Sequence, residues 1–462
     1  MSHSFLIAAP HSGSGKTTIA RGLMALLTQK GYRVQPFKCG PDYIDTKFHA
    51  AVCGRPSINL DTFMATPEHV RELFQRYGEG ADVCIVEGMM GLYDGYDRDR
   101  GSSAEIARVL DIPVVLVVDA KSAAYSTAAL LSGFLHFGDS HPSVLRTAPL
   151  RQGDSHPSVL RTAPLRQGGS MRFAGVIFNK VGSEKHYRML QEVCDDLQVE
   201  CLGYLPKSAE LEQGSRYLGL DFSEIKSPKL GGWGSEQVSI DLDRLLHLTT
   251  SPSIRPLSSP NLGGGKTLIA RNDESFSFLY QETIDALGQV DFFDPETEVL
   301  CLDNVDLLYL PGGYPEKHLE ALVKAEATRR AIKDYAERGG RIIAECGGMM
   351  YLCEAIVTDA PTPQSCEQPP SGRGAVEYPM CGVLPYKITA RQEDRKLSLG
   401  YRRFVLDGKE YRGHEFHYTQ FLGETPKSVT QVYNAKGEPV DTPVFRYKNV
   451  LASYTHLYLI DS

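Results

Sequence analysis

A phosphate-binding loop lies at the start of the chain, between an apolar run and a helical stretch. The run Phe5–Ala9 is apolar, and Ser12–Thr18 (SGSGKTT) follows it before the helix predicted over Thr17–Gln29. A strand, a glycine-rich turn and a helix in this order bring backbone N–H groups around a phosphate at the helix N-terminus. The feature predicts an α/β fold that begins with a nucleotide site.

The loop residues have complementary roles toward a nucleotide. Lys16 can reach the β- and γ-phosphates, and the Thr17 hydroxyl can bind Mg²⁺. Pro10 stands where the strict Walker pattern has its first glycine. The alternative is a plain Gly/Ser turn before a surface helix. The predicted nucleotide-binding residues are Gly13, Ser14, Gly15, Lys16, Thr17 and Thr18.

Two acidic segments are expected at the carboxyl ends of neighbouring strands, where open α/β sheets bind ligands. They are 38–45 (KCGPDYID) and 87–95 (EGMMGLYDG), the second directly after the apolar run Val83–Val86. Carboxylates beside a triphosphate need a cation between them, so Asp42 and Glu87 join Thr17 as predicted Mg²⁺ ligands. Helix caps and turn formation are the alternative for each carboxylate. Asp119, after another apolar run, is a weaker candidate.

The pattern of apolar runs and helical stretches predicts two α/β domains. Continuous apolar runs over Val83–Val86, Val114–Val118 and Ala174–Phe178 fit strands of a parallel sheet that is covered on both faces. A second alternation follows, with strands expected over Thr267–Ala270, Leu307–Leu310 and Arg341–Ala344. Residues 249–265 are rich in Ser, Pro and Gly and are predicted to link a domain of residues 1–248 to one of residues 266–462.

Two further segments look like loop insertions. Residues 138–152 are repeated without change at 153–167, and residues 358–374 are rich in Pro, Ser and Gln. Two copies are too few for a repeat protein, so we expect a duplicated surface loop with no function of its own.

Composition narrows the class of protein. A net charge of -8 argues against a nucleic-acid partner. Neither a signal peptide nor an apolar stretch long enough for a membrane helix is evident. The ten cysteines are scattered without zinc-site spacing. A reducing, cytoplasmic setting is therefore expected.

A second reactive site is predicted around Cys346. This cysteine follows the strand predicted over Arg341–Ala344 and Glu345, and it precedes Gly347-Gly348, as at a nucleophile elbow between strand and helix. A nearby helix N-terminus would favour the thiolate. The Gly313 and Gly347 N–H groups are predicted to form the oxyanion hole, and His456 is the predicted general base. A buried structural cysteine is the alternative for Cys346, and Cys353 is expected to be core packing.

Together these segments resemble the cobyrinic acid a,c-diamide synthase family, the glutamine-dependent amidases of cobalamin biosynthesis. The resemblance extends over nearly the whole chain. The matching segments are 8–18 (AAPHSGSGKTT), 38–45 (KCGPDYID), 87–95 (EGMMGLYDG), 270–276 (ARNDESF), 311–316 (PGGYPE) and 413–418 (GHEFHY).

The resemblance implies a P-loop NTPase-like amidoligase domain, similar to dethiobiotin synthetase, and a C-terminal class I glutamine amidotransferase domain. It implies Cys346 as nucleophile with His456 beside it, and Tyr43, Asp45 and Asp94 as substrate residues. Many class I glutaminases have a glutamate two residues after the histidine, whereas this chain has Tyr458. The group that orients His456 therefore stays open, with Glu415 and His417 as candidates.

The implied reaction joins two half-reactions. Cys346 releases ammonia from glutamine, while Mg·ATP phosphorylates a carboxylate of cobyrinate, and ammonia then displaces phosphate. The resemblance implies that this happens at the c and then the a side chain. Ammonia must travel between the domains, so we expect a buried path or a tight interface. Small molecules are the expected partners, and a homodimer is one option.

Three alternatives remain at the level of sequence. The nearest is the same reaction on another tetrapyrrole, hydrogenobyrinate or Ni-sirohydrochlorin. Cobyric acid synthase is a more distant relative that the segments 38–45 and 413–418 disfavour. A non-catalytic P-loop switch is the third, and Pro10-His11 disfavours it because such switches carry an additional lysine early in the loop.

Overall fold

The computed structural model describes residues 2–137, 171–207, 239–251, 265–272, 274–297, 299–360 and 374–459. The chain divides into two compact units. The first comprises Met1–Thr62, Pro67–Leu220 and Ile225–Leu257, and the second Phe63–Thr66, Asp221–Glu224 and Ser258–Ser462. The duplicated segment 138–167 lies outside the described residues.

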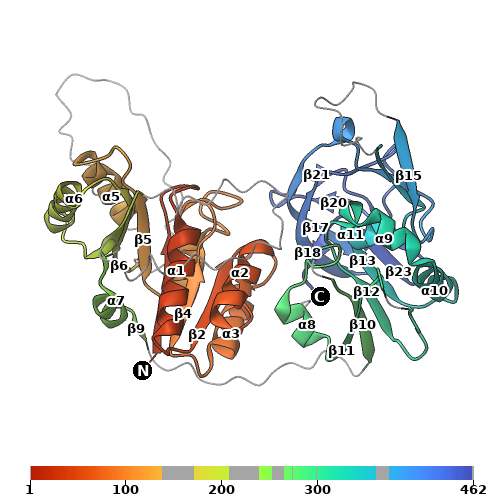
Figure 1. The fold of residues 1–462 in the computed structure, drawn as a ribbon, viewed down its shortest axis with the longest axis horizontal. Helices are drawn as coiled ribbons and strands as arrows, with labels where there is room; N and C mark the ends of the chain where they lie inside the picture. Colours follow the sequence, from red (N-terminus) through yellow and green to blue (C-terminus); the bar gives the residue numbers. More distant parts are fainter. Residues whose placement is uncertain are drawn as a thin grey trace, which may run out of the picture. The chain divides into compact units, whose positions relative to one another are not determined.

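The first unit is built on a mostly parallel sheet (Figure 1). Its strand order is β3-β2-β4-β1-β5-β6-β7-β8, and β9 pairs with β1 outside this order. The strands are β1 (Ser2–Ala8), β2 (Val34–Cys39), β3 (Ile58–Leu60), β4 (Val83–Glu87), β5 (Val114–Asp119), β6 (Phe173–Val181), β7 (Cys201–Pro206), β8 (Ser239–Ile240) and β9 (Thr250–Ser251).

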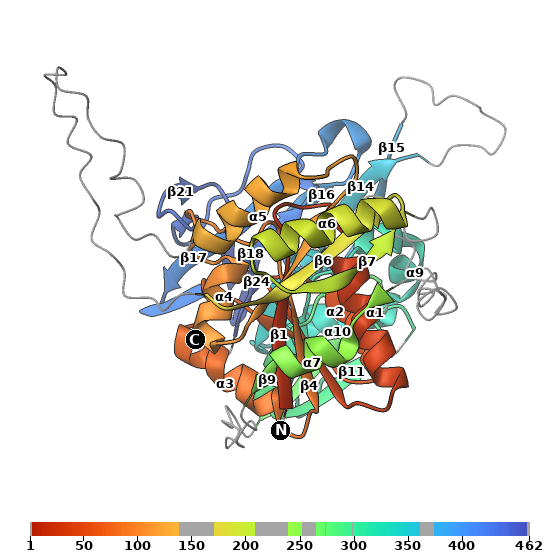
Figure 2. The same ribbon diagram turned by 90° about the vertical axis from the view of Figure 1, so that its left-hand side faces the viewer.

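Helices cover this sheet because its strands are apolar on both faces. One core cluster joins side chains of α1 and α7 to β1, β4 and β5. Helix α5 packs against α6, and the two lie alongside each other in Figure 2. The helices are α1 (Lys16–Gln29), α2 (Ile44–Cys53), α3 (Pro67–Gly78), α4 (Ser103–Leu110), α5 (Ser126–His136), α6 (Glu184–Asp196) and α7 (Leu242–Leu248).

The predicted linker begins too early. Thr250 and Ser251 form β9, which pairs antiparallel with His3 and Ser2 at the start of β1. The parallel neighbour β5 pairs with β1 only at Leu6–Ala8, so the earlier part of that edge is open to β9. Composition missed this strand because Ser, Thr and Pro are typical of linkers, whereas a strand edge accepts any backbone with free N–H and C=O groups.

The second unit is also an α/β structure, with three sheets. The central sheet has the order β11-β10-β12-β13-β23-β22, and all its pairs are parallel except β22 with β23. Its strands are β10 (Lys266–Ala270), β11 (Gln289–Phe293), β12 (Leu307–Leu310), β13 (Ile342–Glu345), β22 (Val444–Tyr447) and β23 (Val450–Ser453).

Different elements pack against the two faces of this central sheet. One apolar cluster joins α9, α10 and α11 to β12 and β13, and another joins the opposite face to Phe404, Val432 and Leu457 of a second sheet. The helices are α8 (Gln281–Ala286), α9 (Leu319–Lys324), α10 (Glu326–Glu337) and α11 (Gly347–Leu352), with a 3₁₀ turn at Pro315–Lys317.

The second sheet of this unit has the order β21-β20-β17-β18-β24, and the third has the order β15-β14-β16-β19. Their strands are β14 (Ala355–Asp359), β15 (Ala375–Pro379), β16 (Lys387–Thr389), β17 (Ser398–Leu406), β18 (Lys409–His417), β19 (Gln420–Phe421), β20 (Val432–Tyr433), β21 (Pro439–Val440) and β24 (His456–Leu457). The 3₁₀ turn Gln392–Asp394 lies between β16 and β17.

The insertion predicted over 358–374 is shorter than expected. Thr358 and Asp359 belong to β14, which pairs antiparallel with β15, so the segment between them is a hairpin connection. Its residues 361–373 lie outside the described residues. Among the described helices, none combines the length and apolar character needed to span a membrane.

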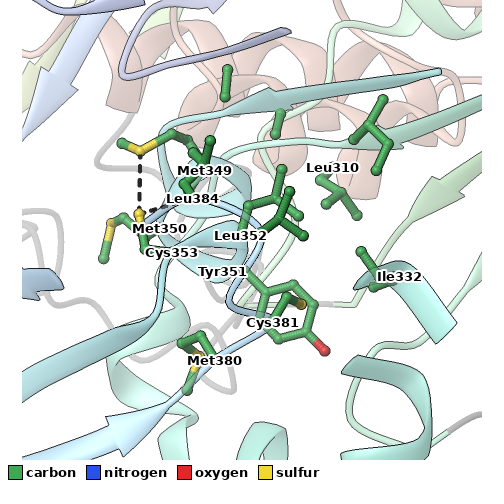
Figure 3. Packing of buried hydrophobic residues seen from close by; sticks show 14 of the residues in the cluster. Leu310, Ile332, Met349, Met350, Tyr351, Leu352, Cys353, Met380, Cys381 and Leu384 are labelled. Carbon is green, nitrogen blue, oxygen red and sulfur yellow. Dashed lines mark hydrogen bonds between the residues drawn. The ribbon is translucent and has the colours of Figure 1, made fainter. Parts of the chain in front are cut away.

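Helix α11 is buried on all sides and fixes the end of β13 (Figure 3). Met349, Tyr351 and Leu352 all belong to the large core cluster, which Leu310 and Met380 also join. Cys353 follows the last residue of the helix and is fully buried, with its thiol 3.4 Å from the carbonyl oxygen of Met349. This confirms the expected core packing of Cys353.

Close packing of α11 against β12 makes Gly348 sensitive to substitution. A Cβ at Gly348 would lie 2.0 Å from the carbonyl oxygen of Leu310, which is backbone and cannot move aside. We expect Gly348→Ala to lower the free energy of unfolding by about 1–3 kcal/mol. Gly374→Ala is the control, since a Cβ there meets nothing within 4 Å. Thermal unfolding of both variants checks this, and equal midpoints would contradict it.

Candidate active sites

The phosphate loop of the first unit is anchored by β6. Gly13 and Gly15 have φ of 83° and 97°, conformations that glycine adopts without strain. A Cβ at Gly15 would lie 2.1 Å from Nδ2 of Asn179, which donates a 3.0 Å hydrogen bond to the carbonyl oxygen of Ser14. The loop therefore depends on glycine at 15 and on an amide from a distant strand.

The N-terminus of α1 is suited to an anion. Among the described residues, no side chain caps the first turn, and that turn contains no acidic residue. A helix start of this kind favours an anion, because its dipole and its first backbone N–H groups attract negative charge. Lys16 is mostly buried beside the loop, and its ammonium group donates to the carbonyl oxygen of Met90. The Ser14 hydroxyl bonds within the loop to the carbonyl oxygen of His11.

A buried charge cluster lies at the ends of β2 and β4. The ammonium group of Lys38 is 2.9 Å from Asp45, 3.1 Å from Glu87 and 3.9 Å from Asp42. Burial opposes the charge on Lys38, but Asp45, Glu87 and Asp42 outweigh it and raise the pKa of Lys38. Burial likewise opposes ionisation of Glu87, but Lys38 outweighs it and holds the pKa of Glu87 well below its usual range. Three carboxylates thus share one lysine.

Both oxygens of Glu87 have specific partners. The hydroxyl of Thr17 donates to Oε1 over 2.6 Å, and Nε2 of His49 donates to Oε2 over 2.7 Å. Ser57 in turn donates to Nδ1 of His49 over 3.1 Å, and His49 and Glu87 are fully buried. Oε1 also accepts from the ammonium group of Lys38 over 3.1 Å, so both oxygens of Glu87 are held by the protein, with Oε1 on the side of Thr17 in the phosphate loop.

Among the described residues, no group of three or more His, Cys, Asp or Glu side chains could hold a metal ion by itself, so a magnesium ion here would depend on the phosphates of the nucleotide as well as on Thr17 and Glu87. Mg²⁺ prefers oxygen ligands and is commonly held by one or two carboxylates together with substrate phosphates. The Thr17 hydroxyl and Oε1 of Glu87 lie together beside the loop, and the shortage of positive charge around Lys38 would be relieved by a divalent cation. Asp42 is partly committed elsewhere, because its Oδ1 accepts from the N–H groups of Ile44 and Asp45 at the start of α2.

The predicted substrate residues lie around the same strand ends, with internal contacts. Asp45 is 1% exposed and faces Lys38, and Tyr43 is buried at the start of α2. Asp94 accepts from the N–H of Gly91 over 2.9 Å and stabilises a turn. Contact of these residues with a substrate stays a prediction.

Asp119 forms an ion pair rather than facing the cluster. Its carboxylate is 2.7 Å from the ammonium group of Lys180, which lies next to the anchoring Asn179 on β6. Asp119 therefore contributes to holding the strand ends that flank the phosphate loop.

In the second unit, Cys346 has the strained backbone of a nucleophile elbow. Its φ is 44° and its ψ is -106°, between the end of β13 at Glu345 and the start of α11 at Gly347. A non-glycine residue in this conformation costs free energy and persists only where its surroundings enforce it. The N–H of Cys346 donates to the carbonyl oxygen of Ser453 over 2.8 Å, which holds the turn to β23.

The predicted oxyanion glycines lie together. A Cβ at Gly347 would lie 3.0 Å from the backbone nitrogen of Gly313, so the two glycines are neighbours. A Cβ at Gly312 would lie only 2.1 Å from Cε1 of His456. The segment Gly312–Gly313 therefore touches both the residue after Cys346 and the imidazole of His456. This arrangement brings the predicted nucleophile, oxyanion glycines and base into one region.

Burial favours the neutral forms of the thiol and the imidazole. It raises the pKa of Cys346, with the carboxylates of Glu316 and Glu415 adding to the effect. It also lowers the pKa of His456 well below its usual range, helped by His414. The N–H of Gly347 at the start of α11 lowers the pKa of Cys346, in the direction expected of a helix N-terminus, but burial and the nearby carboxylates outweigh it.

The two candidates for orienting His456 bond to each other. One oxygen of Glu415 accepts from Arg402 and Thr442, and the other accepts from Nε2 of His417 over 2.6 Å. Nδ1 of His417 lies 2.8 Å from the carbonyl oxygen of Thr419. The hydrogen-bonding groups of the Glu415 and His417 side chains thus bond to each other and to neighbouring residues.

Comparison with known proteins finds one family model for each of the two units. Residues 5–218 match the model described as CobQ/CobB/MinD/ParA nucleotide binding domain, and residues 268–462 match the CobB/CobQ-like glutamine amidotransferase domain. The chain is 35% identical to cobyrinate a,c-diamide synthase of Caldanaerobacter subterraneus subsp. tengcongensis, covering 99% of this chain and 96% of that protein. It is 34% identical to hydrogenobyrinate a,c-diamide synthase of Brucella anthropi, covering 98% of each.

The chain belongs to the a,c-diamide synthase family. A third relative, cobyrinate a,c-diamide synthase of Priestia megaterium, is 33% identical over 98% of this chain and 93% of that protein. The family's two-domain α/β architecture, with a P-loop domain before a glutamine amidotransferase domain, is confirmed.

Sequence analysis missed several residues that shape these a,c-diamide synthase sites. Asn179 could have been suspected, because it directly follows the apolar run Ala174–Phe178 and so lies at a strand end. His49 carries no such signal, since it lies inside a helix and contacts Glu87 only in the folded chain. His414 was noticed only as part of a motif, and its stacking on His456 depends on strand pairing.

The contact between His49 and Glu87 leads to a test of the metal site. We expect His49→Leu to weaken binding of Mg·ADP about tenfold, because Glu87 loses the donor that orients it. His49→Gln is the matched control, since its amide N–H can still donate to Glu87. Calorimetric titration with ADP, with and without Mg²⁺, measures both affinities. An equal loss in the absence of Mg²⁺ would show that His49 acts on the fold instead.

A buried carboxyl group of the second unit predicts a pH dependence of stability. Burial raises the pKa of Glu282 to about 8. A carboxyl group with a raised pKa stabilises the fold fully below its unfolded pKa of about 4.3, and this contribution is lost as the pH rises through 8. We therefore expect Glu282→Gln to leave stability unchanged at low pH and to increase it at pH 8.

The difference between the folded and unfolded pKa of Glu282 also sets how large the gain in stability should be, and it indicates a suitable control. The gain for Glu282→Gln at pH 8 should be on the order of a few kcal/mol, measured by urea unfolding across the pH range. Glu326→Gln serves as control, because Glu326 is exposed and pairs with Arg330 on the surface of α10. A gain of the same size at low pH would rule out titration of Glu282 as the cause.

Proposed function

We propose that this protein uses ATP and glutamine to amidate the a and c carboxylates of cobyrinate. The observation that carries the proposal is the presence of a phosphate loop and a strained cysteine elbow in one chain, both in the family's order. Relatives that match this chain over nearly its full length support the proposal, since their names describe this reaction.

At the glutaminase site, Cys346 attacks the side-chain amide carbon of glutamine. His456 takes the thiol proton and delivers it to the leaving nitrogen, so that ammonia departs and a thioester remains. The Gly313 and Gly347 N–H groups stabilise the oxyanion that develops on the amide oxygen. Water then hydrolyses the thioester to release glutamate.

At the nucleotide site, a carboxylate of the substrate attacks the γ-phosphorus of ATP and ADP leaves. Backbone N–H groups of Gly13–Thr18 hold the phosphates, and Lys16 offsets the charge of the transferring group. Thr17 and Glu87, with Asp42 near them, would hold a Mg²⁺ ion, which would supply positive charge to the phosphates. Ammonia attacks the acyl phosphate, and inorganic phosphate leaves as the amide forms. Tyr43, Asp45 and Asp94 are the proposed substrate residues.

Hydrogenobyrinate is the second candidate substrate. Relatives that bear its name are as similar to this chain as those named for cobyrinate, at 34–35% identity. The two macrocycles present the same carboxylates and differ in the central metal. Pocket shape, rather than the motifs, would decide between them.

The direct test is incubation of the protein with Mg·ATP, glutamine and either macrocycle, followed by mass spectrometry. Two successive exchanges of a carboxylic acid for an amide, dependent on ATP, are expected for the true substrate. Glutaminase activity with no change in either macrocycle would reject both candidate substrates.

The division of labour between the sites gives a sharper prediction. We expect Cys346→Ala to abolish amidation with glutamine and to leave amidation with ammonium chloride within about twofold of the parent. The reason is that ammonia bypasses the thiol chemistry. Lys16→Ala is the converse control and should lose amidation with both donors. Loss of the ammonium-dependent activity in Cys346→Ala would overturn the assignment.

A further inference from the structure

The imidazole of His456 lies against a second histidine. The rings of His414 and His456 are stacked, with centroids 4.9 Å apart and planes within 17° of parallel. Strand pairing causes this contact, because His414 on β18 lies directly opposite His456 on β24 in an antiparallel ladder. Opposite residues in such a pair have Cβ atoms close together, so stacked rings are a natural outcome.

The side chain of His414 is held in place by a polar contact and by burial. Its Nδ1 lies 3.0 Å from the hydroxyl of Tyr280, within hydrogen-bond distance, and its side chain is buried. Burial, together with the nearby charge of Arg402, lowers the pKa of His414 to about 3. His414 therefore presents a neutral ring face to His456. The stacked ring therefore limits the orientations that the imidazole of His456 can take, although His414 also opposes a positive charge on that imidazole.

Other groups complete the surroundings of His456. Gly312 approaches the edge of its ring so closely that a Cβ would lie 2.1 Å from Cε1, and the ring of Phe278 lies at 5.8 Å. Glu415 and His417 influence the pKa of His456 but bond to each other. The ring plane of His456 is thus defined by packing contacts on several sides.

We propose that His414 is a positioning residue for His456, with Tyr280 holding His414 in place. In glutaminases with a third catalytic carboxylate, that group orients the histidine. Here Tyr458 occupies the corresponding position, and the stacked, hydrogen-bonded His414 takes over the orienting role. The inference rests on the proposed glutaminase activity and adds a residue to it.

Three variants separate the stacking from the hydrogen bond. His414→Ala removes both, His414→Phe keeps a flat ring but loses the bond to Tyr280, and Tyr280→Phe removes only the hydroxyl. Phe404→Leu is the matched control, because Phe404 is fully buried in the adjoining strand β17 and belongs to an apolar core cluster. Thermal unfolding shows whether each variant remains folded.

Glutaminase kinetics give the first readout. We expect His414→Ala to lower kcat about 30-fold with KM for glutamine within about threefold, because proton transfer suffers while substrate binding does not. His414→Phe should recover most of that loss, and Tyr280→Phe should lose about threefold. Amidation with ammonium chloride should stay at the parent level in all of them.

A second readout does not depend on turnover. The rate at which iodoacetamide alkylates Cys346, followed by peptide mass spectrometry, reports how well His456 withdraws the thiol proton. This rate should fall in His414→Ala and recover in His414→Phe. A folded His414→Ala variant with parent-like kcat and alkylation rate would overturn the proposal, as would a His414→Phe variant no better than His414→Ala. Absence of glutaminase activity in the parent would reject the proposed function, while the alkylation rates would still test His414.

Discussion

A buried parallel strand must turn sharply before its covering helix, and both candidate sites are made from the backbone groups at such turns. After β1, the turn passes through Gly13 and Gly15, both with positive φ, and ends at the start of α1. After β13, the turn forces Cys346 to a φ of 44° and sets it beside the glycines of the neighbouring strand end. The chemistry of each unit therefore depends on strand burial, since only a strand fixed on both faces can hold a strained or glycine-rich turn in one conformation.

Burial also determines the electrostatics, but with opposite results in the two units. In the first unit, Lys38 is surrounded by carboxylates, and charges persist because they neutralise one another. In the second unit, burial outweighs the nearby charges and favours the neutral forms of Cys346 and His456. The first site is thus preorganised for a highly charged ligand. The second must create its charges during the reaction.

The sequence predicted the parts of this structure that local patterns encode. The apolar runs and glycine turns gave the strands around both sites, and the phosphate loop and Cys346 elbow were found with their correct neighbours. What local patterns do not encode is which distant residues meet. Asn179 on the loop, His49 on Glu87 and His414 on His456 are all contacts across many residues. The strand β9 was missed for a related reason, because its pairing depends on an open edge of β1 rather than on its own composition.

The neutral pair of Cys346 and His456 has a consequence for how glutamine hydrolysis begins. Separating a thiolate and an imidazolium in a buried site is costly unless the two ions stay in contact and further groups stabilise them. A bound amide supplies part of that stabilisation, because thiol attack moves the negative charge to an oxygen that the Gly313 and Gly347 N–H groups can bind. His414, stacked on His456, holds the imidazole ring in one orientation for proton transfer but, like burial, opposes a positive charge on it. The imidazolium is therefore stable only while the negative charge of the reacting amide lies close by, and so the strained turn at Cys346, which sets the thiol beside the two glycines, and the stacked ring act in the same step.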